Sequence, residues 1–141
     1  MNSPVRVVLD TNCVVSALLF STGKLSKFRY LWQQGTIIPV TCKITVMELC
    51  HVLAYPKFKL SKADIDDLLA DYIPWIEIYS DKIPTVVVPE LRDEKDNIFI
   101  SLAIAAQTNY LISGDKHLAE LKDIVPSANI ISPLSFLEIY A

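Results

Sequence analysis

Glycine, cysteine and histidine are scarce in this sequence, and each shortage excludes a class of site. The 141 residues contain three glycines, without a G-x-G-x-x-G or P-loop motif, so dinucleotide binding and Walker-type phosphate binding are disfavoured. The cysteines, Cys13, Cys42 and Cys50, are odd in number and form no C-x-x-C pair, which argues against a disulfide framework or a zinc site. We expect each to be a small buried side chain in a reducing compartment.

The sequence also lacks the signals of export and of a membrane span. Asp10 interrupts the first apolar run, and no small-residue cleavage site follows it. The long charge-free stretch at residues 98–114 contains several polar side chains and is too short for a bilayer span. We therefore expect a soluble protein of the cytoplasm.

Composition and charge set limits on the class of protein. With 52% hydrophobic and 21% charged residues, the chain is rich enough in apolar side chains to form one folded domain over residues 1–141. The net charge of −3 and the pI near 5.3 weigh against nucleic-acid binding, because phosphate attracts Lys and Arg. The objection weakens if four acids are committed to metal, because setting them aside changes −3 to +1.

Apolar periodicity and end signals predict strands that alternate with helices. The predicted strands are Val5–Leu9, 36–40, Tyr110–Ile112 and Ile130–Ile131, with short extended or irregular pieces at 75–79 and 85–88. The predicted helices cover residues 13–20, 24–34, 43–55, 62–73, 95–107 and 116–121, and a last helix begins at Ser132-Pro133. This alternation predicts an α/β fold, a three-layer α/β/α arrangement around a mainly parallel central sheet.

Two predicted strands are followed closely by an aspartate. Asp10 comes directly after Val5–Leu9, and Asp115 stands three residues after Tyr110–Ile112. Ligands of open parallel sheets bind beyond the carboxyl ends of the strands, so two carboxylates placed there would face one crevice. Alternatively, each aspartate only caps the helix that follows it.

Glu48 is the only charged side chain between positions 44 and 54 of the predicted third helix. A helix that is apolar nearly all round is usually buried, and an isolated buried carboxylate costs several kcal/mol unless it is paired or bound to a metal. The alternatives are a Lys or Arg partner elsewhere in the chain, or a Glu48 exposed at an opening in the surface.

Asp96 and Asn97 stand at the start of the long apolar helix predicted at 95–107. Capping explains these acids nearly as well as chemistry does, because Asp93 suits an N-cap and acids in a first turn suit the helix dipole. The capping role and the chemical role are compatible if Asp93 caps the helix while Asp96 points into the crevice. Converging carboxylates would bind a hard cation such as Mg²⁺ or Mn²⁺, which relieves their repulsion and can activate water.

Four short motifs in this order resemble the PIN-domain family. They are V-L-D-T-N at 8–12, M-E-L at 47–49, R-D-E-K-D-N at 92–97 and Y-L-I-S-G-D at 110–115, and they look most like its VapC-like toxins of toxin–antitoxin pairs. The resemblance implies a Mg²⁺- or Mn²⁺-dependent endoribonuclease, often a homodimer and often neutralised by a protein antitoxin. It implies catalytic and metal-binding roles for Asp10, Glu48, Asp96 and Asp115, with Asn12, Asp93 and Ser113 in support.

Two other interpretations of the acids stay open. An aspartyl nucleophile at Asp10 would make the chain a phosphohydrolase, although such sites commonly carry a second Asp where this chain has Asn12. A non-catalytic binding module would retain the acids as a remnant or as a docking surface. Six cations, either a phosphate-binding rim or an ordinary solvated face, stand at Lys24, Lys27, Arg29, Lys57, Lys59 and Lys62.

Overall fold

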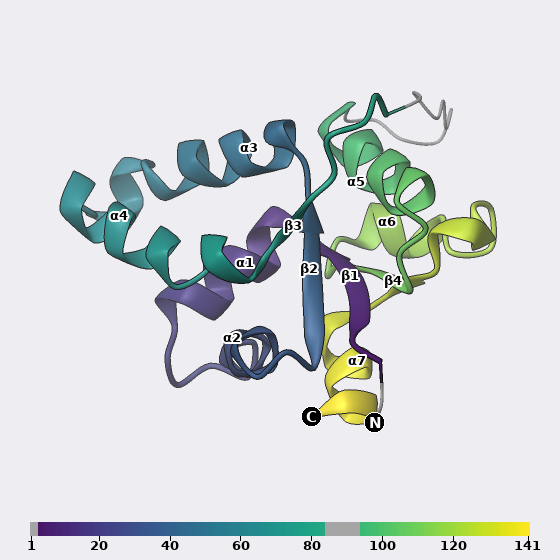
Figure 1. Ribbon diagram of the computed structural model, residues 1–141, viewed down its shortest axis with the longest axis horizontal. Helices are drawn as coiled ribbons and strands as arrows, with labels where there is room; N and C mark the ends of the chain where they lie inside the picture. Colours follow the sequence, from purple (N-terminus) through teal and green to yellow (C-terminus); the bar gives the residue numbers. More distant parts are fainter. Residues whose placement is uncertain (1–2, 84–93) are drawn as a thin grey trace.

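The computed structural model describes residues 3–83 and 94–141, with the side chains of 94–96 left aside (Figure 1). Within them lies a five-stranded sheet in which every neighbouring pair is parallel. Its spatial order is β3-β2-β1-β4-β5, formed by β1 (Val5–Leu9), β2 (Ile37–Thr41), β3 (Glu77–Ile78), β4 (Tyr110–Ile112) and β5 (Ile130–Ile131). The predicted α/β/α class with a parallel sheet is confirmed.

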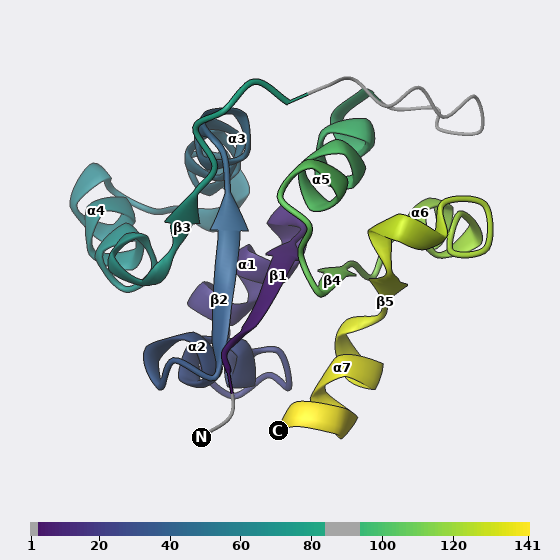
Figure 2. The same ribbon diagram turned by 45° about the vertical axis from the view of Figure 1, so that its right-hand side comes forward.

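Helices connect the strands and cover the sheet. They are α1 (Thr11–Leu19), α2 (Ser26–Gln33), α3 (Lys43–Leu53), α4 (Lys62–Ala70), α5 (Glu94–Ala105), α6 (Lys116–Glu120) and α7 (Pro133–Tyr140), with short 3₁₀ turns η1 (Pro56–Phe58), η2 (Ile73–Trp75) and η3 (Pro126–Ala128). Figures 1 and 2 show α3 and α4 on one side of β2, and α5 and α6 on the other. None of the helices in the described residues combines the length and apolarity needed to span a bilayer.

Alternation along the central strand β1 divides the core into two layers. Val7 and Leu9 face the cluster formed with α1, α2 and α7, whereas Val8 faces the cluster formed with α5 and α6. Successive side chains of a strand point to opposite faces, so a strand buried on both sides must be apolar throughout. Burying each such side chain stabilises the fold by about 1.5–3 kcal/mol. This requirement explains the uninterrupted apolar run after Arg6.

The strand order creates a reversal in the path of the chain at its centre. From β1 the chain moves outward to β2 and β3, then returns to β4 on the other side of β1 and continues to β5. The switch point therefore lies between the carboxyl ends of β1 and β4, where open parallel sheets bind ligands. The backbone N–H of Asp10 donates to the carbonyl of Ile112 at 3.1 Å, so these two strand ends are joined.

Several predicted boundaries were wrong by two or three residues. The helix predicted at 62–73 ends at Ala70, and Pro74 lies in the separate 3₁₀ turn η2. The piece predicted as extended or irregular at 75–79 contains β3, which pairs with β2. Cys50 is only half-buried, whereas Cys13 and Cys42 are buried as expected, and all three are free thiols. The piece predicted at 85–88 lies outside the described residues.

Candidate functional site

Asp10 stands at the switch point with its two carboxylate oxygens engaged by different elements. Oδ1 accepts from the N–H of Cys13 at 2.8 Å, which is the N-cap contact of α1. Oδ2 accepts from the hydroxyl of Ser113 at 2.6 Å, and this bond crosses from β1 to the segment after β4. The side chain is 8% exposed. Capping thus accounts for one oxygen only, and the other faces the second strand end.

Ser113 links Asp10 to Asp115. Its hydroxyl donates to Asp10 and accepts from the backbone N–H of Asp115 at 3.0 Å, and its side chain is buried. Asp115 is half-buried and caps α6, with Oδ1 accepting from the N–H of His117 at 2.7 Å. Ser113 therefore links Asp10 to the backbone of Asp115, and the expectation that the two carboxylates face one crevice stays a prediction.

Glu48 reaches the same region through Thr11. The hydroxyl of Thr11, the residue after Asp10, donates to Oε2 of Glu48 at 3.2 Å, which connects α1 to α3. The expectation that Glu48 lies in a buried helix was wrong, because the carboxylate is half-buried and Ile44 and Met47 on the same helix are 59% and 60% exposed. Apolar composition alone does not distinguish a buried helix from one with an open apolar face.

The remaining predicted residues are only partly described. Asp96 lies in the first turn of α5, but its side chain is not described, and Asp93 lies outside the described residues. Asn97, next to Asp96, is half-buried, and its Oδ1 accepts from the hydroxyl of Ser101 at 3.2 Å. Asn12 is exposed on the first turn of α1. The supporting roles of Asn12 and Asp93, and the metal-binding role of Asp96, stay predictions.

The carboxylates of Asp10, Glu48 and Asp115 belong to elements that hydrogen bonds join near the switch point, but they are not gathered into one cluster. Among the side chains that the structure describes, no three Asp, Glu, His or Cys groups lie close enough to hold a metal ion. Asp10, Glu48 and Asp115 each accept a hydrogen bond from a neutral donor. Their oxygens are the ligand type that hard divalent cations prefer, so this donor set fits Mg²⁺ or Mn²⁺.

Thr11 and Cys13 are contacts of the site that sequence reasoning missed. Thr11 is buried and connects two of the acids, and its only signal was its place beside Asp10 in the first motif. Cys13 is buried beside Asp10, and burial, followed by the nearby carboxylate, raises the pKa of its thiol. The thiol of Cys13 therefore stays neutral and adds no second negative charge next to the carboxylate of Asp10.

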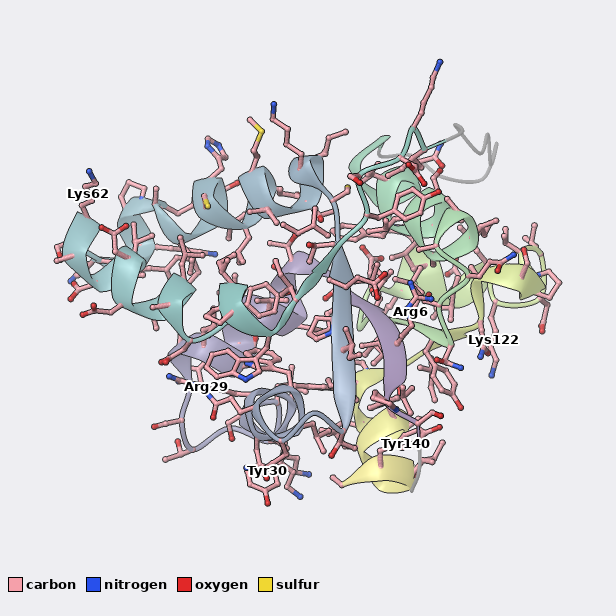
Figure 3. The ribbon with its side chains drawn as sticks, viewed as in Figure 1. Arg6, Arg29, Tyr30, Lys62, Lys122 and Tyr140 are labelled. Atoms are coloured by element: carbon pink, nitrogen blue, oxygen red, sulfur yellow. The ribbon has the colours of Figure 1, made fainter. Side chains whose placement is uncertain are left out.

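The six cations differ in their surroundings. Arg29 makes an ion pair with Asp71, and Figure 3 places Lys62 at the far end of α4. The other four, Lys24, Lys27, Lys57 and Lys59, are exposed. Of the aromatic and apolar side chains beside Arg29, Phe28, Leu31 and Trp32 are core residues, whereas Tyr30 projects outward.

Known proteins resemble this chain in sequence and in fold. Residues 6–117 match the PIN domain family, which is well over half of the chain. An uncharacterized protein of Methanocaldococcus jannaschii is 28% identical over 119 residues, covering 84% of this chain and 76% of that protein.

A similar fold is found in a solved structure from Rickettsia felis. The matching chain belongs to VapBC2, which was crystallised bound to a DNA fragment from its promoter. The TM-score is 0.61 at 15% identity, and the match covers 91% of this chain and 98% of that chain. The matched family spans the motifs from β1 to the start of α6, including all four predicted acids. The chain therefore belongs to the PIN domain family, whose members are generally nucleases.

Proposed function

We propose that this PIN domain, a single domain over residues 1–141, is an endoribonuclease that hydrolyses RNA phosphodiester bonds with a bound Mg²⁺ or Mn²⁺ ion. The acids that would hold the cation are Asp10, Glu48, Asp96 and Asp115. One observation carries the proposal: Ser113 bonds both Asp10 and the backbone of Asp115 at the switch point of the sheet. Helix capping alone does not require this cross-strand bond. PIN nucleases generally use divalent metal ions, which agrees with the donor set.

The protein's own contribution is to fix the carboxylates before substrate arrives. Ser113 holds one oxygen of Asp10, the N–H of Cys13 holds the other, and Thr11 holds Glu48. Groups that bond a ligand-bearing side chain set its orientation and its basicity. When bound, a divalent cation supplies an activated water and stabilises the charge that develops on the phosphodiester.

We further propose that the protein is the toxin of a toxin–antitoxin pair. It would act in the cytoplasm as a homodimer and be neutralised by a protein antitoxin. The support is the resemblance of its motifs to VapC-like toxins and the likeness of its fold to a chain of the VapBC2 complex. Exposed apolar side chains on α3, Ile44 and Met47, stand on the same helix as Glu48, where a bound partner would cover the site.

The test is cleavage of a fluorescently labelled single-stranded RNA in Mg²⁺ or Mn²⁺, by the unchanged protein and by Asp10→Asn. We expect cleavage to stop in excess chelator and to fall at least ~100-fold in Asp10→Asn, since metal catalysis contributes several kcal/mol. The matched control is Asp123→Asn, the same change at an exposed position after α6. Full cleavage by folded Asp10→Asn, or cleavage in chelator, would refute the proposal.

A further inference from the structure

An apolar groove opens beside the candidate site, and among its described lining residues there is no Asp10, Glu48 or Asp115. Its volume is about 540 Å³, within the range of pockets that bind small ligands. It lies between the end of α1, the turn that follows α1 and the start of α7. The lining includes Phe20, Leu25, Pro133 and Leu134, with Gly114 at the edge next to Asp115.

We propose that this groove binds a nucleotide of the RNA substrate, with its base against Phe20 and its phosphate against Lys24. The inference rests on the proposed function and adds a base-binding subsite to it. Gly114 places the groove within one residue of Asp115. Phe20 stands ten residues after Asp10 at the opposite end of α1, about 15 Å away along the helix axis. The subsite would therefore serve a nucleotide a few positions away from the scissile phosphate.

Phe20 has the exposure and the fixed backbone of a stacking platform. It is 55% exposed although it lines the groove, so much of its side chain is accessible to a ligand. Its N–H donates to the carbonyl of Ser16, and its carbonyl accepts from the N–H of Gly23, both at 3.1 Å. A platform held in place loses little freedom when a base stacks on it.

The lining combines a cation with an exposed aromatic ring, which favours a nucleotide over an uncharged apolar segment. Lys24 is the charged side chain among the residues that line the groove, and it is exposed. A cation beside an aromatic ring suits the alternation of phosphate and base along a single strand. The hydroxyl of Ser16, one helical turn before Phe20, adds a polar group within the lining.

The experiment measures binding of two fluorescent oligomers to the Asp10→Asn protein, which prevents cleavage during the titration. One is a twelve-nucleotide oligo(U), and the other is the same ribose-phosphate chain without bases. Adding Phe20→Ala should weaken binding of oligo(U) roughly five- to hundredfold and leave the abasic chain unchanged, because stacking needs a base. Phe20→Tyr, which keeps the ring, should restore binding.

One further variant tests the contact with phosphate, and another is a control for the loss of an exposed ring. Lys24→Gln should weaken both oligomers alike and reduce the salt dependence by about one counterion. Tyr30→Ala removes a similarly exposed ring that Figure 3 shows projecting from α2, and it should change neither affinity.

Two results would overturn the inference. The first is an unchanged oligo(U) affinity in Phe20→Ala, which would indicate that the groove binds a protein segment instead. The second is an equal loss of affinity for both oligomers. Failure of the unchanged protein to cleave RNA in Mn²⁺ would instead refute the proposed function. The binding comparison is read without cleavage, so the two failures are distinguishable.

Discussion

Ser113→Ala removes the one side chain that bonds both strand-end aspartates. Its hydroxyl donates to Oδ2 of Asp10 at 2.6 Å and accepts from the N–H of Asp115 at 3.0 Å, and the side chain is 2% exposed. The substitution deletes a single oxygen atom directly after the end of β4. It therefore reports what these two bonds contribute to stability and to metal binding.

The expected magnitude follows from the two bonds. A hydrogen bond to a charged group contributes about 1.5–3 kcal/mol, and one between neutral groups about 1 kcal/mol. The free energy of unfolding without metal should therefore fall by roughly 2–4 kcal/mol. Losing a group that orients a metal ligand commonly weakens metal binding ~10–100-fold, so we expect a Mn²⁺ dissociation constant raised by that factor.

Urea unfolding and Mn²⁺ titration calorimetry measure the two effects separately. Ser113→Thr keeps the hydroxyl and should retain most of the Mn²⁺ affinity. The matched control is Ser61→Ala, which removes the capping box of α4 and should cost about 0.5–2 kcal/mol of stability without changing Mn²⁺ binding. If Ser113→Ala binds Mn²⁺ as tightly as the unchanged protein, Ser113 does not position the metal ligands.

Three further changes test other parts of the structure. Thr11→Val removes the donor to Glu48 and should weaken Mn²⁺ binding in calorimetry, whereas Thr11→Ser should not; equal affinities would contradict the link. The partly exposed ion pair between Arg6 and Glu77 lowers the pKa of that glutamate, chiefly through the hydrogen bond from Arg6. Glu77→Gln should therefore cost up to about 1 kcal/mol at pH 7, and the difference should vanish as the pH falls through the folded pKa, below the usual value of about 4.3. A difference in urea unfolding that does not shrink at all between pH 7 and pH 2 would contradict this assignment. Leu102→Ala opens a cavity where α5 packs on the sheet and should cost about 2–5 kcal/mol in urea unfolding; a cost below 1 kcal/mol would contradict its burial.

The parts of the fold that sequence predicts well are those in which burial leaves little choice. The run at Val5–Leu9 must be a strand buried on both faces, and β1 has these bounds. Ser132-Pro133 carries both a cap and a first-turn proline, and α7 begins there. Ser61 likewise begins α4 with a capping box, and Ile65, Leu68 and Leu69 of that helix pack against the core.

The parts that sequence predicts poorly depend on contacts between distant residues. β3 has two residues, Glu77 and Ile78, and forms because they pair with the end of β2, which local pattern does not encode. The exposure of Ile44 and Met47 depends on what lies opposite α3. The apolar character of α3 therefore predicted burial, and Glu48 is half-buried instead.

The candidate site also contains residues that sequence predicts and residues that it misses. Asp10 and Asp115 were found from strand ends, because parallel topology brings the carboxyl ends of neighbouring strands together. Thr11 was missed, because a threonine in a first helical turn has no feature that marks a partner 37 positions later in the chain. Asp96 rests on its motif and on the family, since its side chain is not described.

The most direct test of the account is the position of Mn²⁺ in crystals soaked with the ion, located by its anomalous scattering. We predict an ion at the switch point, bonded to carboxylate oxygens of Asp10 and Asp115 at ~2.0–2.2 Å. Glu48 and Asp96 should bind it directly or through water. Mn²⁺ held by other residues, with Asp10 still bonded only to Ser113 and Cys13, would contradict the assignment of these acids as a metal site.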